Sequence, residues 1–168
     1  MNRLIRKTAC VVMAITLITG AFTACRKPRT EVNETEAALP SFTSVRDDSG
    51  NLSPDGTVGD MEYRIMGQDQ YGCYNQDRGY YVDTLDQPDS PYFIVVSAGI
   101  PEREGGELTI TDLGMQDSTL VIVVEEKEAT GAKTDELDCP CAVLEVDHMP
   151  SDLVVVSTTG EQFESLFE

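Results

Sequence analysis

The stretch YFIVVSAGIPEREGGELTITDLGMQDSTLVIVVEE, residues 92–126, decides the fold class. It opens with YFIVVSA (92–98) and closes with STLVIVVEE (118–126), and both segments are apolar on both faces, as interior strands are. Between them ELTITDL (107–113) alternates, so that Leu108 and Ile110 face inward. We expect the two apolar segments to pair centrally in one sheet and to supply the core.

The link between the first two of these segments is rich in charge and ends in Gly105-Gly106. Adjacent glycines permit positive φ and a close approach of the backbone. Residues 95–114 are therefore predicted to form a β-hairpin. Residues 114–118 predict a second, short hairpin connection before the next strand.

Further strands are indicated on both sides of this stretch. Four other segments are short runs rich in strand-forming residues: MEYRIM (61–66), GYYVDTL (79–85), CAVLEV (141–146) and LVVVST (153–158). Only the tail, 160–168, has spacing that suits a helical turn or two. Short strands separated by turns predict a mostly β chain, an antiparallel β-sandwich or a partly open barrel.

The N-terminus has the pattern of a bacterial lipoprotein signal. Arg3, Arg6 and Lys7 precede the apolar run 9–22, which is too short for a comfortable membrane span, and FTAC places Ala24 before Cys25. This end resembles a lipobox, which implies cleavage after residue 24 and acylation of Cys25. An ordinary cleaved secretory signal and a retained membrane anchor are the alternatives. We expect a lipid-anchored protein, palmitate among its acyl chains, on the extracytoplasmic face of the membrane.

Composition suggests how the remaining chain is divided. Residues 25–57 have little apolar periodicity and many Pro, Gly, Ser, Thr and charged residues, so we expect a disordered acidic tether followed by a β domain over 58–168. DDSGNLSPDG (47–56) hints at a calcium loop, but a turn-rich linker is favoured because the EF-hand order is missing. With 30 acidic and 12 basic side chains, the net charge of −18 argues against nucleic-acid binding.

The cysteines leave several arrangements open. Besides Cys25, the chain after the signal has Cys73, Cys139 and Cys141, an odd number that cannot pair completely. Cys73 can bridge one of the other two, all three can stay reduced, or the three can bind zinc with His148. We expect no cofactor and no metal.

Nothing in the sequence predicts an enzyme. His148 is the single histidine, and the nucleophile, zinc-protease and phosphate-loop motifs are absent. We interpret His148 as a surface residue at the end of a strand.

The loop and its flanking strands carry a family pattern. Gly99, Pro101, Gly105 and Gly106 lie in the loop, Leu108 and Ile110 in the next strand, and Pro140 before a later one. On these residues the segment 92–158 resembles the C-terminal domain of PrcB, a subunit of a bacterial surface protease complex. Glu107 departs from the family, which usually has an aromatic residue there. The loop is also similar in kind to those with which chagasin-type inhibitors enter protease clefts.

The resemblance implies a non-catalytic binding module that docks onto, stabilises or restrains a surface or secreted protein such as a protease. Exposed loops on a rigid β scaffold commonly carry binding. The expected partner-binding residues are Gly99, Pro101, Arg103, Gly105, Gly106 and Glu107. Two alternatives stay open: a surface lipoprotein that binds a cation or small ligand through the Tyr-rich segment 71–81, and a structural envelope protein.

Overall fold

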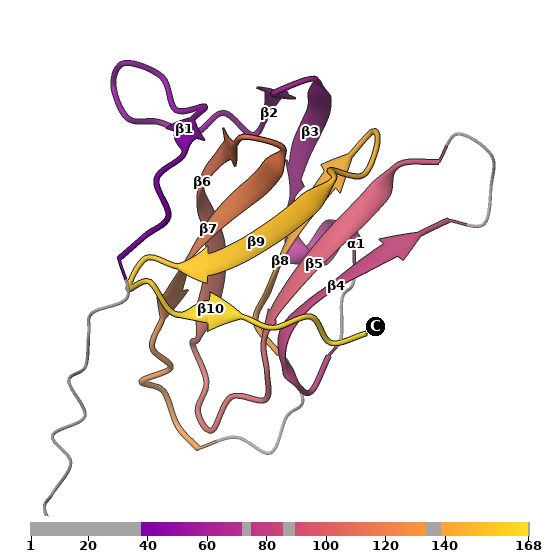
Figure 1. The fold of residues 1–168 in the computed structure, drawn as a ribbon. Helices are drawn as coiled ribbons and strands as arrows, with labels where there is room; N and C mark the ends of the chain where they lie inside the picture. The colour runs from indigo at the N-terminus through magenta and orange to yellow at the C-terminus, as the bar shows by residue number, and fades with distance from the viewer. Residues whose placement is uncertain (1–37, 72–74, 86–89, 134–138, 168) are drawn as a thin grey trace, which may run out of the picture. The chain divides into compact units, whose positions relative to one another are not determined.

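A computed structural model describes residues 38–71, 75–85, 90–133 and 139–167. The chain divides into two units, Met1–Asn33 and Glu34–Glu168, and the first lies outside the described residues. The described part is mostly β (Figure 1). No helix within it is long and apolar enough to cross a membrane. Its elements are β1 (Thr43–Ser44), β2 (Asp55–Val58), β3 (Met61–Met66), α1 (Gln68–Tyr71), β4 (Arg78–Thr84), β5 (Tyr92–Ala98), β6 (Glu107–Gln116), β7 (Thr119–Lys127), β8 (Cys141–Val146), β9 (Asp152–Ser157) and β10 (Gln162–Phe163).

Two five-stranded sheets form a β-sandwich, which confirms the predicted fold class; the sheets do not close into a barrel. The first sheet has the order β1-β6-β7-β9-β10, and the second has the order β2-β3-β8-β5-β4. Neighbouring strands are antiparallel except β7 and β9, which are parallel. The core lies between the sheets, where residues two apart along each strand face the same side, such as Ile94 and Val96 of β5 and Leu120, Ile122 and Val124 of β7.

The predicted hairpin over 95–114 is wrong. β5 belongs to the second sheet and β6 to the first, so the link between them crosses from one layer to the other. The predicted pairing of the two doubly apolar segments is wrong for the same reason, because β7 pairs with β6 and β9. The outward-facing side chains of β5 and β7 are apolar for a different reason. On each strand they pack in a small cluster on the outer side of its sheet. Phe93 and Val95 lie in one such cluster, and Val121 and Val123 in the other.

Two local predictions near strand ends also need correction. β6 continues through Gly114 to Gln116, so the turn to β7 is confined to Asp117 and Ser118, and Asp117 has a φ of +55°. Over its described residues, 160–167, the tail forms no helix. Instead, the tail pairs with β9 as strand β10, and Ser165 then forms a β-bridge with Tyr80 of β4. The tail is held extended because it pairs with the backbone groups at the edges of β9 and β4.

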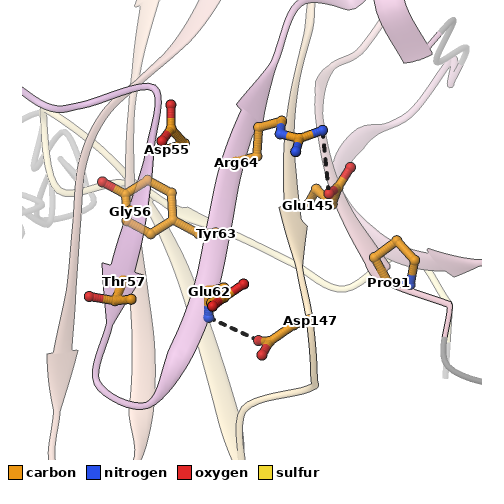
Figure 2. Close-up of a pocket in the computed structure, with 9 residues that line it drawn as sticks. All are labelled: Asp55, Gly56, Thr57, Glu62, Tyr63, Arg64, Pro91, Glu145 and Asp147. Carbon is orange, nitrogen blue, oxygen red and sulfur yellow. Dashed lines mark hydrogen bonds and ion pairs between the residues drawn. The ribbon is translucent and has the colours of Figure 1, made fainter.

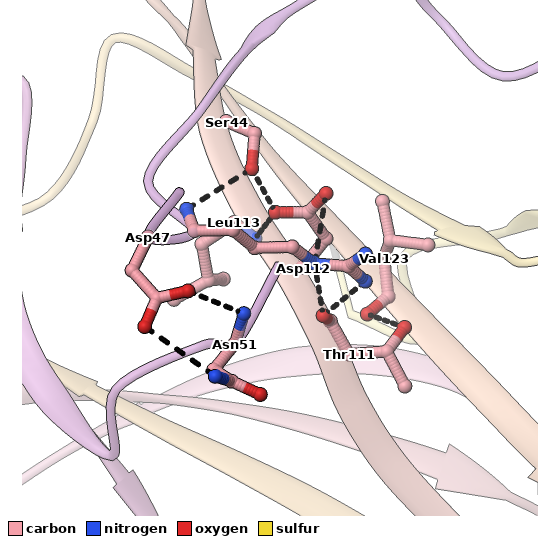
Figure 3. Close-up of polar contacts among 8 residues, drawn as sticks. Ser44, Asp47, Asn51, Thr111, Asp112, Leu113 and Val123 are labelled. Atoms are coloured by element: carbon pink, nitrogen blue, oxygen red, sulfur yellow. Dashed lines mark hydrogen bonds and ion pairs between the residues drawn. The ribbon is translucent and has the colours of Figure 1, made fainter. Parts of the chain in front are cut away.

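The expected tether ends too late in the sequence. From Phe42 the chain is part of the sandwich: β1 pairs with β6, β2 pairs with β3, and Val45 and Leu52 pack against the core. Composition does not predict that this segment belongs to the β domain, because polar side chains attach it to β6. Ser44 donates to Asp112 at 2.6 Å (Figure 3). Arg46 lies 3.3 Å from the other oxygen of that carboxylate. Residues 25–37, with Cys25, lie outside the described residues.

Candidate functional site

The β5–β6 loop, residues 99–106, is bonded to a second loop. The Glu104 amide donates to the Ala132 carbonyl at 3.0 Å, and the Gly131 amide donates to the Glu104 carbonyl at 2.9 Å. Both loops connect one sheet to the other and lie together at the lower end of the sandwich in Figure 1. Backbone bonds between two crossing segments hold them as one unit, which we call the loop pair (99–106 and 128–133).

Two glycines set the course of the first loop. Gly99 has a φ of +79°, and a Cβ there would lie 3.1 Å from the Arg78 amide nitrogen, so the chain turns tightly against β4. Gly105 has a φ of +86° and open space where a Cβ would lie. Glycine is favoured at both positions because other residues seldom adopt these angles.

The charged residues of the expected site make local contacts. Arg103 donates from Nη1 to the Gly131 carbonyl at 3.0 Å, so its guanidinium ties the loop pair together. Glu107 lies 3.0 Å from the ammonium of Lys127, and both side chains are largely exposed. These contacts fix the backbone but leave the charges at the surface.

A groove of about 270 Å³ runs beside the loop pair. Four of the six expected residues line it: Gly99, Pro101, Gly106 and Glu107. Arg103 and Gly105 do not line it and are exposed on the loop itself. Ala98, Ala129 and Pro140 add apolar surface, and Glu126, Lys127 and Glu128 complete the lining. The groove is therefore apolar within and charged at its margin.

A second groove, of about 380 Å³, adjoins the first at Gly106 and Glu107. Its apolar lining comes from three strands of both sheets: Ile65, Met66, Leu108, Ile110 and Ala142. Sequence reasoning missed this groove because only the layering of the sheets brings residues 65, 108 and 142 together. The alternation of Leu108 and Ile110 was the one signal available.

A third depression, about 580 Å³, lies on the outer side of the second sheet (Figure 2). Four carboxylates line it, Asp55, Glu62, Glu145 and Asp147, together with Arg64, which lies 3.8 Å from Glu145. The Asp147 carboxylate accepts the Glu62 amide at 2.9 Å. Among the described residues, no group of three His, Cys, Asp or Glu side chains is arranged to hold a metal ion.

The sequence hint of calcium at 47–56 corresponds to a self-contained turn. One carboxylate oxygen of Asp47 accepts the Ser49 amide at 2.9 Å and the Asn51 amide at 2.8 Å. Figure 3 shows the contact between Asp47 and Asn51. The Asn51 amide is the main cause that lowers the pKa of Asp47. The carboxylate thus serves the turn, and this turn lies within the β domain rather than in the predicted linker.

The Tyr-rich segment of the alternative hypothesis packs against β5. The ring of Tyr71 lies 4.6 Å from that of Phe93, and its hydroxyl donates to Asp83. Burial, followed by the hydrogen bond to Asp83, raises the pKa of Tyr71 well above its ordinary value of 10.0. Residues 72–74 lie outside the described residues, so only part of this segment is placed.

His148 is an exposed residue that follows the end of β8, as expected. Its Nδ1 lies 2.9 Å from Asp147, and its Nε2 lies 3.7 Å from Asp60.

Cys141 is disulfide-bonded, whereas Cys139 is a buried, reduced cysteine. Cys73 lies outside the described residues. A zinc site on the three cysteines is excluded in this state, because Cys141 has no thiolate to offer.

Comparison with known proteins adds no relative: no family model, no curated protein and no solved structure matches this chain. The resemblance to the PrcB C-terminal domain therefore stays a hypothesis that rests on the sequence pattern of residues 92–158 alone.

Proposed function

We propose that this chain is a non-catalytic binding module that docks onto a surface or secreted protein, such as a protease, through the loop pair and its groove. The observation that supports this most directly is the mutual hydrogen bonding of the two crossing loops beside an apolar groove. Such a pair presents side chains from a fixed backbone, which lowers the entropy lost on binding.

One exposed side chain offers an apolar contact at this end. Ile100 is 49% exposed although its amide is anchored to the Gln76 carbonyl at 3.2 Å. Its neighbours Gly99 and Pro101 line the groove, so Ile100 is the apolar side chain that we propose to contact the partner. Leu85 is a matched control for Ile100. It is 51% exposed and directly follows β4, whose last residue pairs with the first residue of β5, at the end of β5 opposite Ile100.

The test is capture of envelope proteins from the source cells by the full-length protein in non-ionic detergent. We expect a stoichiometric surface or secreted protein to be retained, to be lost with Ile100→Asp, and to be kept with Leu85→Asp. Equal retention by both variants would contradict the proposal. A thermal shift of several degrees with calcium but not magnesium would instead favour the cation-binding alternative.

We also propose that the module is attached to the extracytoplasmic face of the membrane through a lipid on Cys25. The basic n-region, the short apolar run and the small residue before Cys25 support this. Incorporation of labelled palmitate into the protein, absent in Cys25→Ser, is the expected result. No label in the unaltered protein, or equal labelling of Cys25→Ser, would contradict a lipid on Cys25.

A further inference from the structure

One edge of β6 is only partly occupied. β7 pairs with β6 along its whole length, but on the other side β1 pairs only with Gly114 and Met115, and the Val45 amide reaches the Leu113 carbonyl at 2.9 Å. The Arg46 side chain then donates to the Thr111 carbonyl. Beyond this point no described residue pairs with Glu107–Ile110 on the β1 side (Figure 1). We call these four residues the open edge.

The open edge lies along the second groove. All four of its residues line that groove of about 380 Å³, and Ile65 and Met66 of β3 form part of its opposite wall. Leu108 and Ile110 turn their side chains into the core, while Glu107 and Thr109 are exposed. An unpaired strand edge beside an open apolar groove is the arrangement that extended peptides use when they add a strand to a sheet.

Natural sheets usually protect such edges. In this protein the tail pairs with the edge of β4 at Tyr80. On the edge of β6, Arg46 donates to the Thr111 carbonyl, and this is the last protected group before the open edge. At about 3.3 Å per residue, the open edge is roughly 13 Å long, enough for a short strand.

The charge around the open edge indicates the composition of the occupant. Glu107 lies in the edge, 3.0 Å from Lys127, and Glu125 is opposite Thr109 on β7. Glu102 and Glu104 are exposed on the adjoining loop, so these four acidic side chains outnumber the basic Lys127 and Arg103 beside them. The chain as a whole has a net charge of −18. An added strand alternates its side chains between the two faces of the sheet. Apolar residues would enter the groove over Leu108 and Ile110, and basic residues would lie on the outer face beside Glu107, with Glu125 one strand further away.

We infer that the open edge of β6 binds an extended segment of a partner protein, in which apolar and basic residues alternate, as an additional strand of the first sheet. This inference rests on the proposed binding function and specifies the kind of segment that the module recognises. Backbone hydrogen bonds to β6 supply affinity, and the groove and the acidic margin supply selectivity.

The probe for this inference is an acetylated, amidated seven-residue peptide of alternating Lys and Val with a fluorescent label, titrated against the full-length protein in detergent. We expect saturable binding. A peptide methylated at alternate backbone nitrogens should bind at least about tenfold more weakly, because it loses two or more hydrogen bonds. Replacing Lys by Glu in the peptide should abolish binding.

Two protein variants and a map of protection locate the site. Glu107→Lys should weaken binding, whereas Glu62→Lys, an exposed acid on the second sheet, should not. Hydrogen exchange should slow within the open edge when the peptide binds. Equal affinity for the methylated peptide, protection confined to other segments, or no binding would each overturn the inference.

A competition step separates this inference from the proposed function. If excess peptide releases the envelope protein captured through Ile100, both stand. If capture depends on Ile100 but the peptide releases nothing, strand addition by that partner is wrong and the binding function remains. If Ile100→Asp leaves capture unchanged while the peptide still binds the open edge, the role of the loop pair is wrong instead.

Discussion

Arg78 of β4 donates to the Glu126 carboxylate of β7 at 2.6 Å and thereby joins the two sheets at the end where the loop pair lies. The same guanidinium lies 3.2 Å from Glu161 and 3.9 Å from the centre of the Phe163 ring. Three strands, β4 of the second sheet and β7 and β10 of the first, thus meet at one cation. The side chain is only 30% exposed, so its interactions are partly shielded from solvent.

Replacing Arg78 with Met should lower the free energy of unfolding by about 1–2 kcal/mol, since a partly exposed ion pair and a cation–π contact each contribute about 1 kcal/mol or less. Urea denaturation measures this. The control is Arg64→Met, which removes a more exposed guanidinium 3.8 Å from its carboxylate and should change stability by less than about 0.5 kcal/mol. Similar losses in both variants would contradict the role of Arg78 as a link between the sheets.

Asp112→Ala should release the N-terminal segment from β6. The Asp112 carboxylate is 14% exposed and contacts both Ser44 and Arg46, so its loss removes one polar partner from each. We expect faster hydrogen exchange across residues 43–47 and a loss of about 1–2 kcal/mol in stability. Asp48→Ala, at an exposed position of the same segment, should change neither. Unchanged exchange in Asp112→Ala would show that β1 is held by its backbone pairing alone.

Tyr71 should make stability fall in alkaline solution. Its pKa is raised in the folded state, by burial first and then by the hydrogen bond to Asp83. The contribution is therefore complete below the ordinary pKa of 10.0 and is lost as the pH rises toward the folded pKa, because the unfolded chain ionises first. Unfolding free energies from about pH 8 to pH 12 should decline above about pH 10, and less steeply in Tyr71→Phe. Parallel profiles would contradict this assignment.

The two cysteines around Pro140 should differ in reactivity. Cys139 is buried and reduced, so iodoacetamide should modify it only after the protein is unfolded. Cys141 is disulfide-bonded and should be modified only when a reductant is also present. Mass spectrometry of peptides from native, unfolded and reduced samples distinguishes these states. Modification of Cys141 in unfolded protein without reductant would refute the disulfide.

The positions of the strands could be predicted from the sequence wherever apolar residues mark the buried side of a strand. β3, β5, β7, β8 and β9 lie close to their predicted ranges, because alternating or continuous apolar residues mark a strand whatever its neighbours are. The segments at 43–44 and 162–163 were missed. Their strand conformation depends on partners far along the chain, such as Met115 for Thr43 and Val155 for Phe163, and two residues are too few to show a period.

The loop residues show the same limit for the candidate site. The sequence singled out Gly99, Pro101, Gly106 and Glu107, and these residues do line one groove. Their supposed setting, a hairpin within one sheet, was wrong. A doubly apolar strand is consistent both with a central place in one sheet and with an outer cluster such as that of Phe93 and Val95, so its pattern cannot choose the layer.

By itself, the sequence determined that this chain is a β protein of strongly acidic composition, since strand patterns and charge are local properties of the residues. Only the tertiary structure decided which strands share a sheet, that the loop pair is bonded across the sandwich, and that β6 keeps an open edge beside Ile65 and Met66. These features depend on contacts between residues far apart in the chain. Such contacts are settled by how two apolar faces are buried together, which no single segment encodes.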